Sequence, residues 1–422
     1  MTVALKMHMW DKEKEKLIKE ALPWSDDISV LFQPTEIGGH LIKNRFVIQP
    51  MEANDAFESN GSPTKNTIIR YKQYAAGGAG IIWLESTAVT LESRVNPRQL
   101  VLIKENLDAF ARLVEAILTA GSHPEGSEAP PFLVIQLNHG GRLARQVPKA
   151  LFHAAVLDAI KNSPLLLDYE LKDLKNTFVD RARLAKEAGF HAIDVKACHG
   201  YLLHECLAAR CRMNSEFGGA FDKRIKLLLD IIKNIMEEVP ALLVTTRLTL
   251  FDGIPYPWGW GTGPNGQPDL SEPLTLLHTL SAVGVRLVNT AFGNPYYDPI
   301  IERPAANTPD LIAISAIQKM LKTAKTIKSQ LPQLSIILTG FSWLGEFWPY
   351  VAAGCIKQGY GDYVGVGRCA LAYPDFVNDL LIIGKLNPNK MCIACSACAT
   401  MLRKGEKVKC ARKIRQRRKY AD

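Results

Sequence analysis

The sequence lacks any run of about 18 uncharged apolar residues, the length that a transmembrane helix needs, so we expect no membrane span. It also lacks a signal peptide, because the apolar residues of segment 1–27 are interrupted by the charged run 11–16 and no small-residue cleavage site follows. These two absences predict a cytoplasmic protein. No G-x-G-x-x-G motif follows the first expected strand, which argues against the alternative of a doubly wound dinucleotide-binding sheet.

The net charge is small outside the C-terminal segment. The formal charge is +9, and residues 399–422, with ten Lys or Arg and two acids, account for +8 of it. The remaining +1 excludes a uniformly basic surface. The basic tail is typical either of a segment that docks an acidic redox partner or of a solvated chain end.

Cysteine is unevenly placed. Four of the nine cysteines lie between Cys392 and Cys410. A disulfide framework is not expected in a long chain without a secretory signal, so clustered thiols indicate metal ligation or catalysis.

What the sequence does contain is a repeated strand–helix order. Eight short runs rich in Val, Ile and Leu are typical of strands covered on both faces: 46–49, 80–84, 132–137, 192–195, 242–248, 286–290, 335–338 and 363–366. Helical patterns follow most of them: 67–76, 106–120, 171–188, 222–238, 271–282, 309–329, 376–383 and, most weakly, 345–353. This order predicts an α/β fold, a (β/α)8 TIM barrel.

We expect three parts in the chain: an N-terminal arm (1–28), the barrel (29–385) and a cysteine segment with the basic tail (386–422). The segment 253–267, rich in Gly, Pro and Trp, is either a lid or a packed loop.

The expected strands end in polar residues, and active sites of TIM barrels lie at the strands' C-terminal ends. The run after the fourth strand is the richest, with Lys196, Cys198, His199 and Tyr201. Gln136 ends the third strand. Barrels commonly bind phosphate after strands seven and eight, where Gly340, Gly367 and Arg368 lie. Together these ends favour a cofactor that carries phosphate.

Several motifs, in order along residues 30–385, carry a family resemblance. They are Leu31-Phe-Gln-Pro, Asn44-Arg45-Phe, Gln49-Pro50-Met51, Glu85-Ser-Thr-Ala-Val, Gln136-Leu-Asn-His139-Gly-Gly-Arg142, His199-Gly-Tyr201, Phe217-Gly-Gly with Arg224, Pro295-Tyr, Arg303-Pro304 and Gly365-Val-Gly-Arg368. The chain resembles the Old Yellow Enzyme family of FMN-dependent oxidoreductases. Within that family it is most similar to the branch of 2,4-dienoyl-CoA reductase, enoate reductases and trimethylamine dehydrogenase.

The resemblance implies an FMN site. Pro50 and Met51 would lie against the flavin, and Glu52 follows them. Gln136 would contact the pyrimidine. Arg247 would lie near N1 and O2, where positive charge stabilises reduced flavin. Gly340, Gly367 and Arg368 would hold the phosphate.

The resemblance also implies a two-step reaction. NAD(P)H, directly or through another protein, reduces FMN, and flavin N5 then passes hydride to the β-carbon of an activated alkene. Side chains at the positions of Lys196 and His199 would bind the oxygen of this small-molecule substrate, where charge develops. Tyr201 would donate the proton.

Two residues depart from the family pattern. Lys196 stands where relatives have His, so it predicts binding of a carboxylate or thioester oxygen, an acid role, or a structural ion pair with Glu205 or another carboxylate. Glu52 stands where relatives often have Cys, Thr or Ala, and its charge disfavours flavin reduction unless Lys196 neutralises it.

The cysteine run reads C-x2-C-x2-C-x11-C over Cys392, Cys395, Cys398 and Cys410. This spacing predicts a 4Fe-4S cluster, as in ferredoxin runs, and the resembling branch carries one here with three residues in the second gap. Structural zinc is the alternative.

Three functions compete. The first is an ene-reductase whose cluster receives electrons from a separate protein, because the sequence ends 12 residues after Cys410 without FAD- or NAD(P)H-binding motifs. The second is a dehydrogenase or demethylase of the trimethylamine dehydrogenase type. The third is an RNA-modifying flavin barrel whose basic tail binds the phosphates of RNA. The aromatic-poor tail and the strand-four motif argue against nucleic acid.

Overall fold

The computed structural model describes residues 12–122 and 129–413. The basic tail beyond residue 413, and the partner binding predicted for it, lie outside the described residues. No helix in the described ranges is long and apolar enough to cross a membrane.

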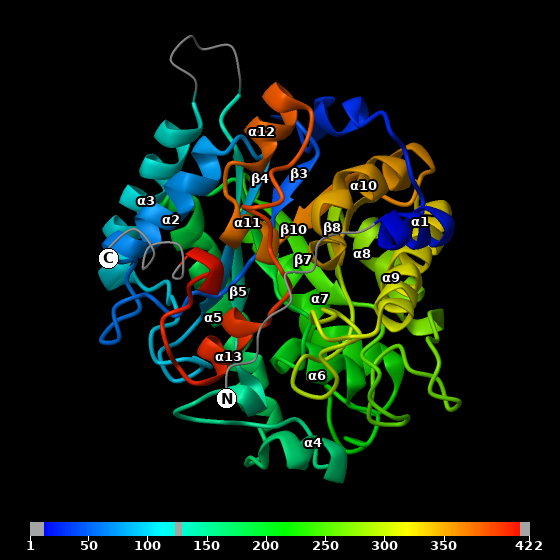
Figure 1. The fold of residues 1–422 in the computed structure, drawn as a ribbon. Helices are drawn as coiled ribbons and strands as arrows, with labels where there is room; N and C mark the ends of the chain where they lie inside the picture. Colours follow the sequence, from blue (N-terminus) through cyan, green and yellow to red (C-terminus); the bar gives the residue numbers. More distant parts are fainter. Residues whose placement is uncertain (1–11, 123–128, 414–422) are drawn as a thin grey trace, which may run out of the picture.

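A closed barrel of eight parallel strands forms the centre of the molecule (Figure 1). Its strands, in barrel order, are β10 (Tyr363–Val366), β3 (Phe46–Ile48), β4 (Ile81–Ala88), β5 (Phe132–Asn138), β6 (Ala192–Val195), β7 (Leu243–Thr249), β8 (Leu287–Ala291) and β9 (Ser335–Leu338). All eight expected strands are therefore present, and the TIM barrel is confirmed. Most of their residues are buried, as strands between a filled interior and a layer of helices must be.

Helices cover the outside of the barrel. They are α2 (Lys65–Ala76), α3 (Leu107–Gly121), α5 (Asp168–Glu187), α7 (Phe221–Glu238), α8 (Ser271–Ala282), α9 (Asp310–Gln330), α10 (Trp348–Lys357), α11 (Arg368–Ala372) and α12 (Phe376–Ile383). The weak pattern at 345–353 becomes the 3-10 segment η4 (Phe341–Phe347) followed by α10.

A hairpin that the sequence did not predict closes the N-terminal end of the barrel. Its strands are β1 (Thr35–Ile37) and β2 (His40–Ile42). Ile37 and Ile42 pack in one buried cluster with residues from the strand beginnings, such as Ile81 and Phe132. Side chains thus fill this end of the barrel.

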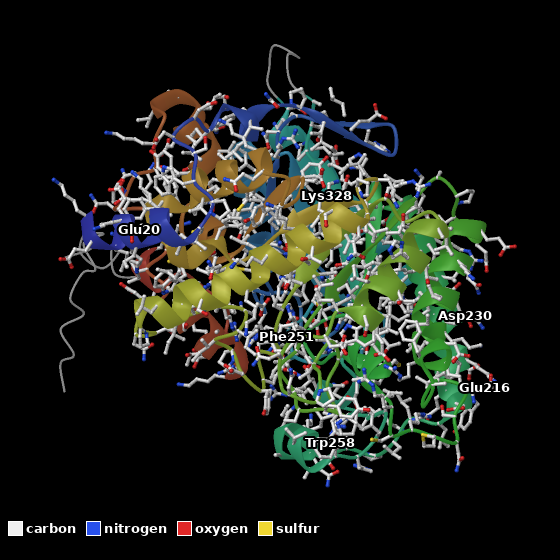
Figure 2. The ribbon with its side chains drawn as sticks, turned by 90° about the vertical axis from the view of Figure 1, so that its right-hand side faces the viewer. Glu20, Glu216, Asp230, Phe251, Trp258 and Lys328 are labelled. Atoms are coloured by element: carbon white, nitrogen blue, oxygen red, sulfur yellow. The ribbon has the colours of Figure 1, made fainter. Side chains whose placement is uncertain are left out.

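The described part of the N-terminal arm packs on the barrel. Figure 2 shows α1 (Lys12–Ala21), which carries Glu20, beside α9. Ile18 is buried in the main core, and Gln318 on α9 donates a hydrogen bond to the carbonyl of Ala21.

The cysteine segment lies across the C-terminal ends of the strands. Two backbone bonds fix it, from Val408 N to Ala53 O (2.8 Å) and from Ala306 N to Ala394 O (2.9 Å). Its helix α13 (Ala397–Arg403) is also held by Arg403, which donates to the carbonyl of Pro295. This segment, which we call the roof (residues 391–408), covers the face where the polar strand ends meet.

Candidate active site

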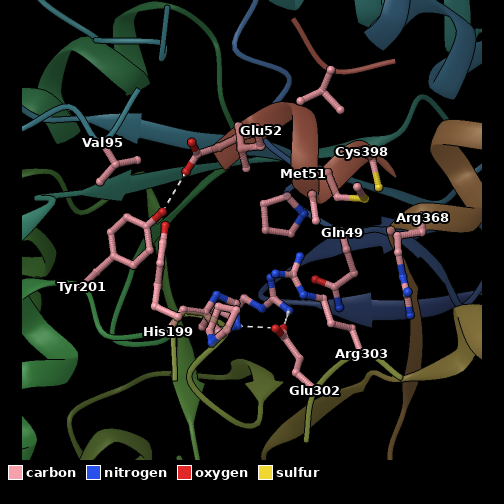
Figure 3. A pocket seen from close by; sticks show the side chains of 18 of the residues that line it. Gln49, Met51, Glu52, Val95, His199, Tyr201, Glu302, Arg303, Arg368 and Cys398 are labelled. Carbon is pink, nitrogen blue, oxygen red and sulfur yellow. Dashed lines mark hydrogen bonds and ion pairs between the residues drawn. The ribbon is translucent and has the colours of Figure 1, made fainter. Parts of the chain in front are cut away.

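A cavity of about 470 Å³ lies between the strand ends and the roof (Figure 3). The predicted site residues that line it are Pro50, Met51, Glu52, Lys196, His199, Tyr201, Arg247, Gly340, Gly367, Arg368 and Cys398. Residues from most of the strand ends thus meet in one place. Gln136, Cys392, Cys395 and Cys410 are not among the lining residues.

The loop after β3 is held in place from two sides. Glu85, within β4, accepts a hydrogen bond from the backbone N–H of Ala53 (2.7 Å). On the other side, a Cβ atom at Gly367 would lie 2.9 Å from the sulfur of Met51, so glycine leaves Met51 its position. Met51 and Glu52 therefore enter the cavity in a defined orientation.

Glu52 and Tyr201 form a hydrogen-bonded pair (Figure 3). The Tyr201 hydroxyl donates to Oε1 of Glu52 (3.0 Å), and Asn96 donates to Oε2 (2.8 Å). Burial, and then the Glu52 carboxylate, raise the pKa of Tyr201 well above its ordinary value. Tyr296 neighbours the same hydroxyl. The phenol is thus protonated at neutral pH, with its proton directed at a carboxylate.

Lys196 lies between β6 and the Tyr201 ring. Its Nζ donates to the hydroxyl of Ser86 (3.1 Å) and lies 3.4 Å from the ring centroid of Tyr201. Burial lowers the pKa of Lys196. The alternative pairing with Glu205 is wrong, because both oxygens of Glu205 are occupied by Arg142.

His199 faces a carboxylate that the sequence analysis did not single out. Its Nε2 lies 2.8 Å from Oε1 of Glu302, and Arg247 lies 3.3 Å from the same oxygen. Burial lowers the pKa of His199 to about 4, so the imidazole is neutral at pH 7. Burial opposes ionisation of Glu302, but His199, Arg247 and Arg303 outweigh it and lower its pKa to about 2.

Three amide side chains lie among the strands. Gln136 donates to Asp194 (2.6 Å), which also accepts from the Trp83 indole (2.9 Å). Gln49 and Asn289 exchange two hydrogen bonds, of 3.0 and 2.8 Å. In this structure the amide of Gln136 is therefore engaged within the barrel wall.

Three arginines line the end of the cavity under the roof: Arg303, Arg368 and Arg403. Arg368 follows Gly367 at the end of β10 and donates to the carbonyl of Pro304 (3.1 Å). Gly340 adopts the left-handed region (φ +98°), which turns the chain after β9 toward the same end. This cationic end suits an anion such as phosphate.

The four cysteines do not gather into a metal centre. Among the described residues, no group of three or more His, Cys, Asp or Glu side chains could hold a metal ion. Cys395 is exposed, whereas Cys392, Cys398 and Cys410 are partly buried. The described residues therefore show no assembled cluster or zinc site, and the iron–sulfur extension is not confirmed.

Sequence reasoning missed several residues that complete the site: Ser86, Asn96, Tyr296, Glu302 and Arg403. Ser86 and Tyr296 lie inside the quoted motifs that begin at Glu85 and Pro295 but were given no role, and Glu302 precedes Arg303 of another quoted motif. A polar residue inside or beside a motif was thus a usable signal. Asn96 lies in a loop with no such signal.

The fold and the site define the chain as a TIM-barrel enzyme with its cavity at the carboxyl ends of the strands. Residues 30–258 match the sequence model of the NADH:flavin oxidoreductase / NADH oxidase family, and the chain belongs to this family. This family consists of FMN-dependent oxidoreductases, and the resemblance to the Old Yellow Enzymes is confirmed.

Two relatives illustrate the similarity. The NADPH dehydrogenase of Listeria monocytogenes serotype 4a (strain HCC23) is 35% identical over 63% of this chain and 74% of its own length. The NADPH dehydrogenase of Bacillus licheniformis is 31% identical over 49% of this chain, which covers 60% of that protein.

Solved structures share the fold. A 2-naphthoyl-CoA reductase complex has a TM-score of 0.75 at 20% identity, over 90% of this chain and 56% of that one. The Old Yellow Enzyme homologue from Zymomonas mobilis has a TM-score of 0.63 at 20% identity, over 85% and 94% of the two chains. At this identity the likeness concerns the fold.

The cavity residues fit FMN. Nε of Arg247 is buried and has no hydrogen-bond partner among the described residues, as expected of a donor that serves a ligand. The cavity volume of about 470 Å³ falls within the usual range of roughly 300–1,000 Å³ for cofactor sites. The three arginines at one end supply the charge that a phosphate needs.

Proposed function

We propose that the chain is an FMN-dependent reductase of activated C=C bonds whose substrate carries a carboxylate or thioester. Bound FMN, reduced by NAD(P)H, supplies the hydride. One observation carries the proposal: Lys196, His199 and Tyr201 enter the same cavity as Arg247, Gly367 and Arg368. The groups that would bind substrate and those that would bind cofactor thus share one space.

Each side chain has a distinct task. The Lys196 ammonium and the neutral His199 imidazole bind the substrate oxygen, where negative charge develops as hydride arrives. Arg247 would bind the flavin edge with its Nε, which has no hydrogen-bond partner among the described residues. Tyr201 gives its proton to the α-carbon, for which its bond to Glu52 must break.

The pair of Glu52 and Tyr201 favours a second candidate, an oxidative dehydrogenase of an amine or a related compound. A phenol that already donates to a carboxylate is poised to pass a proton onward. In this direction Tyr201 takes a proton from the substrate while Glu52 takes the phenol proton, over the 3.0 Å between them.

Anaerobic rapid-mixing kinetics separate the two candidates. We expect NADPH to bleach the flavin, and an unsaturated acid or thioester to restore its colour. Amines should leave the oxidised flavin unchanged. Bleaching by an amine without NADPH, and no reoxidation by any unsaturated compound, would establish the oxidative direction instead.

The cysteine segment keeps its 4Fe-4S cluster as a proposal that rests on the C-x2-C-x2-C-x11-C spacing alone. The link to a separate electron-transfer protein rests on that cluster. Iron and acid-labile sulfide are to be measured after anaerobic purification. About four of each per chain are expected, and a protein with bound flavin but no iron contradicts the cluster.

A further inference from the structure

A second hollow, of about 550 Å³, opens beside the active-site cavity. We call it the basic groove. Its charged lining consists of four cations and two carboxylates: Arg94, Arg98, Arg145, Lys404, Glu58 and Glu92. The net formal charge of this lining is therefore +2, in a chain whose charge is otherwise concentrated in its tail.

The basic groove is continuous with the cavity along two segments. Asn96, which holds Glu52 in the cavity, also lines the groove. On the roof, Arg403 lines the cavity and the next residue, Lys404, lines the groove. A molecule whose reactive end lies in the cavity can therefore extend into the groove.

Three of the four cations are available to a ligand. Arg94 is bound to the carbonyls of Leu91, Glu58 and Pro97 and serves the loop. By contrast, no carboxylate among the described residues forms an ion pair with Arg98, Arg145 or Lys404, and the buried Nε of Arg98 has no hydrogen-bond partner there. Two guanidinium groups without a carboxylate partner in the described part of the chain match the geometry of phosphate oxygens.

We propose that the basic groove binds the phosphorylated ADP arm of a reactant whose other end reacts in the cavity. NADPH and coenzyme A thioesters share this arm, an adenosine with a pyrophosphate and a ribose phosphate. The proposal rests on the proposed function for the reacting end. Glu58 and Glu92 oppose the anion, so Arg98, Arg145 and Lys404 supply the attraction.

The test is equilibrium binding to the full chain, measured by calorimetry, with adenosine 2′,5′-bisphosphate and adenosine 3′,5′-bisphosphate as probes and adenosine as the uncharged control. We expect at least one bisphosphate to bind. Replacing Arg145→Gln together with Lys404→Gln should weaken binding about tenfold or more, because charge-assisted hydrogen bonds are lost. Lys223→Gln with Lys233→Gln, two exposed lysines on α7, is the matched control.

The probes distinguish the sources of the arm. Preference for the 2′,5′-bisphosphate assigns the groove to NADPH, preference for the 3′,5′-bisphosphate assigns it to a thioester, and equal binding supports both. The proposal is overturned if neither bisphosphate binds, or if the control variant weakens bisphosphate binding as much as the double variant in the groove. Because the measurement needs no turnover, a bound bisphosphate with no C=C reduction would refute the proposed function and leave the groove standing.

Discussion

Lys196 is the residue through which this site departs most from the family pattern. It contacts Ser86 and the ring of Tyr201, and no ion pair with a carboxylate among the described residues holds it. Its charge therefore remains available to a substrate anion, which favours acids and thioesters over neutral ketones.

Lys196→Met should remove both the affinity for a carboxylate ligand and its pH dependence. In the parent protein the ammonium form persists below the pKa of Lys196, which burial lowers from 10.5. Binding of cinnamate should thus weaken as pH rises through this lowered pKa, earlier than for an exposed lysine. Titrations with cinnamate, followed by flavin absorbance from neutral to alkaline pH, measure this change in affinity. His199, with its pKa at about 4, stays neutral throughout. The same pH profile in Lys196→Met would exclude the charge as the cause.

Tyr201→Phe should slow only the step with the organic substrate. Loss of a general acid typically costs about 10²–10⁴-fold, whereas hydride transfer from NADPH needs no phenol. Rapid-mixing measurements of the two half-reactions test this, with the exposed Tyr169→Phe as the control. Equal slowing of both steps would contradict the proton-donor role.

Glu52→Gln should shift the balance between the two directions. The Glu52 carboxylate helps to raise the pKa of Tyr201, after burial. Without that charge the Tyr201 phenol becomes a stronger acid. Proton donation to the α-carbon of the alkene substrate should then accelerate, and proton removal from the substrate of the oxidative reaction should slow. The ratio of the two rates in each variant is the readout. An unchanged ratio means that the pair takes no part in proton transfer.

At the residue scale the sequence predicted which side chains line the site better than it predicted which side chains they contact. The motifs brought Tyr201, His199 and Arg247 to one cavity, because strand ends of a barrel converge. The pairing of His199 with Glu302, from a loop 103 positions further on, depends on side-chain directions that periodicity does not encode. For the same reason Lys196 was assigned a wrong alternative partner.

At the scale of elements, one buried ion pair holds the surroundings of the site together. Arg142, in η3 (Gly141–Leu143), binds Glu205 on α6 (Leu202–Ala208) at 2.9 Å and Asp158 on α4 (Ala155–Lys161) at 2.8 Å. Arg142 and Glu205 are almost fully buried. The ion pairs of Arg142 thus connect these three short segments beside Tyr201, and we call this set of contacts the junction.

Arg142→Ala should lower the free energy of unfolding by about 3–5 kcal/mol, because Glu205 would remain buried without its partner. Urea unfolding followed by circular dichroism measures the change. Arg183→Ala is the control, since its pairs with Asp180 and Glu238 are exposed and such pairs contribute about 0–1 kcal/mol. Equal destabilisation by both variants would refute the role of the junction.

The eight barrel strands were predictable because burial on both faces makes them continuous apolar runs. The elements that the sequence missed are short. β1 and β2 have three residues each, and α4 and α6 have seven, too few for a period to emerge. The segment 253–267 is anchored as a packed loop at its base, since Asp252 accepts from Ile254 and Trp260.

At the scale of the whole molecule, the barrel and the roof together enclose the proposed cofactor site. The barrel was predictable from the order of strands and helices. The position of the roof was not, because backbone hydrogen bonds such as that from Val408 to Ala53 fix it, and these carry no side-chain signature.

FMN should stabilise the whole fold, by about 2.7 kcal/mol at a free concentration 100 times its Kd. The midpoint of thermal unfolding should rise more with FMN than with riboflavin, which lacks the phosphate. Arg368→Met should reduce the advantage of FMN and leave the effect of riboflavin, as differential scanning fluorimetry can show. Equal shifts for both ligands would place the phosphate away from the arginines.

The hairpin of β1 and β2 has a consequence for the order of events. It packs the N-terminal end of the barrel with buried side chains, so ligands have no passage through the floor of the described structure. The oxidised hydride donor and the organic substrate must then use the same opening beside the roof. The two reactants therefore bind one after the other, and the first must dissociate before the second can bind.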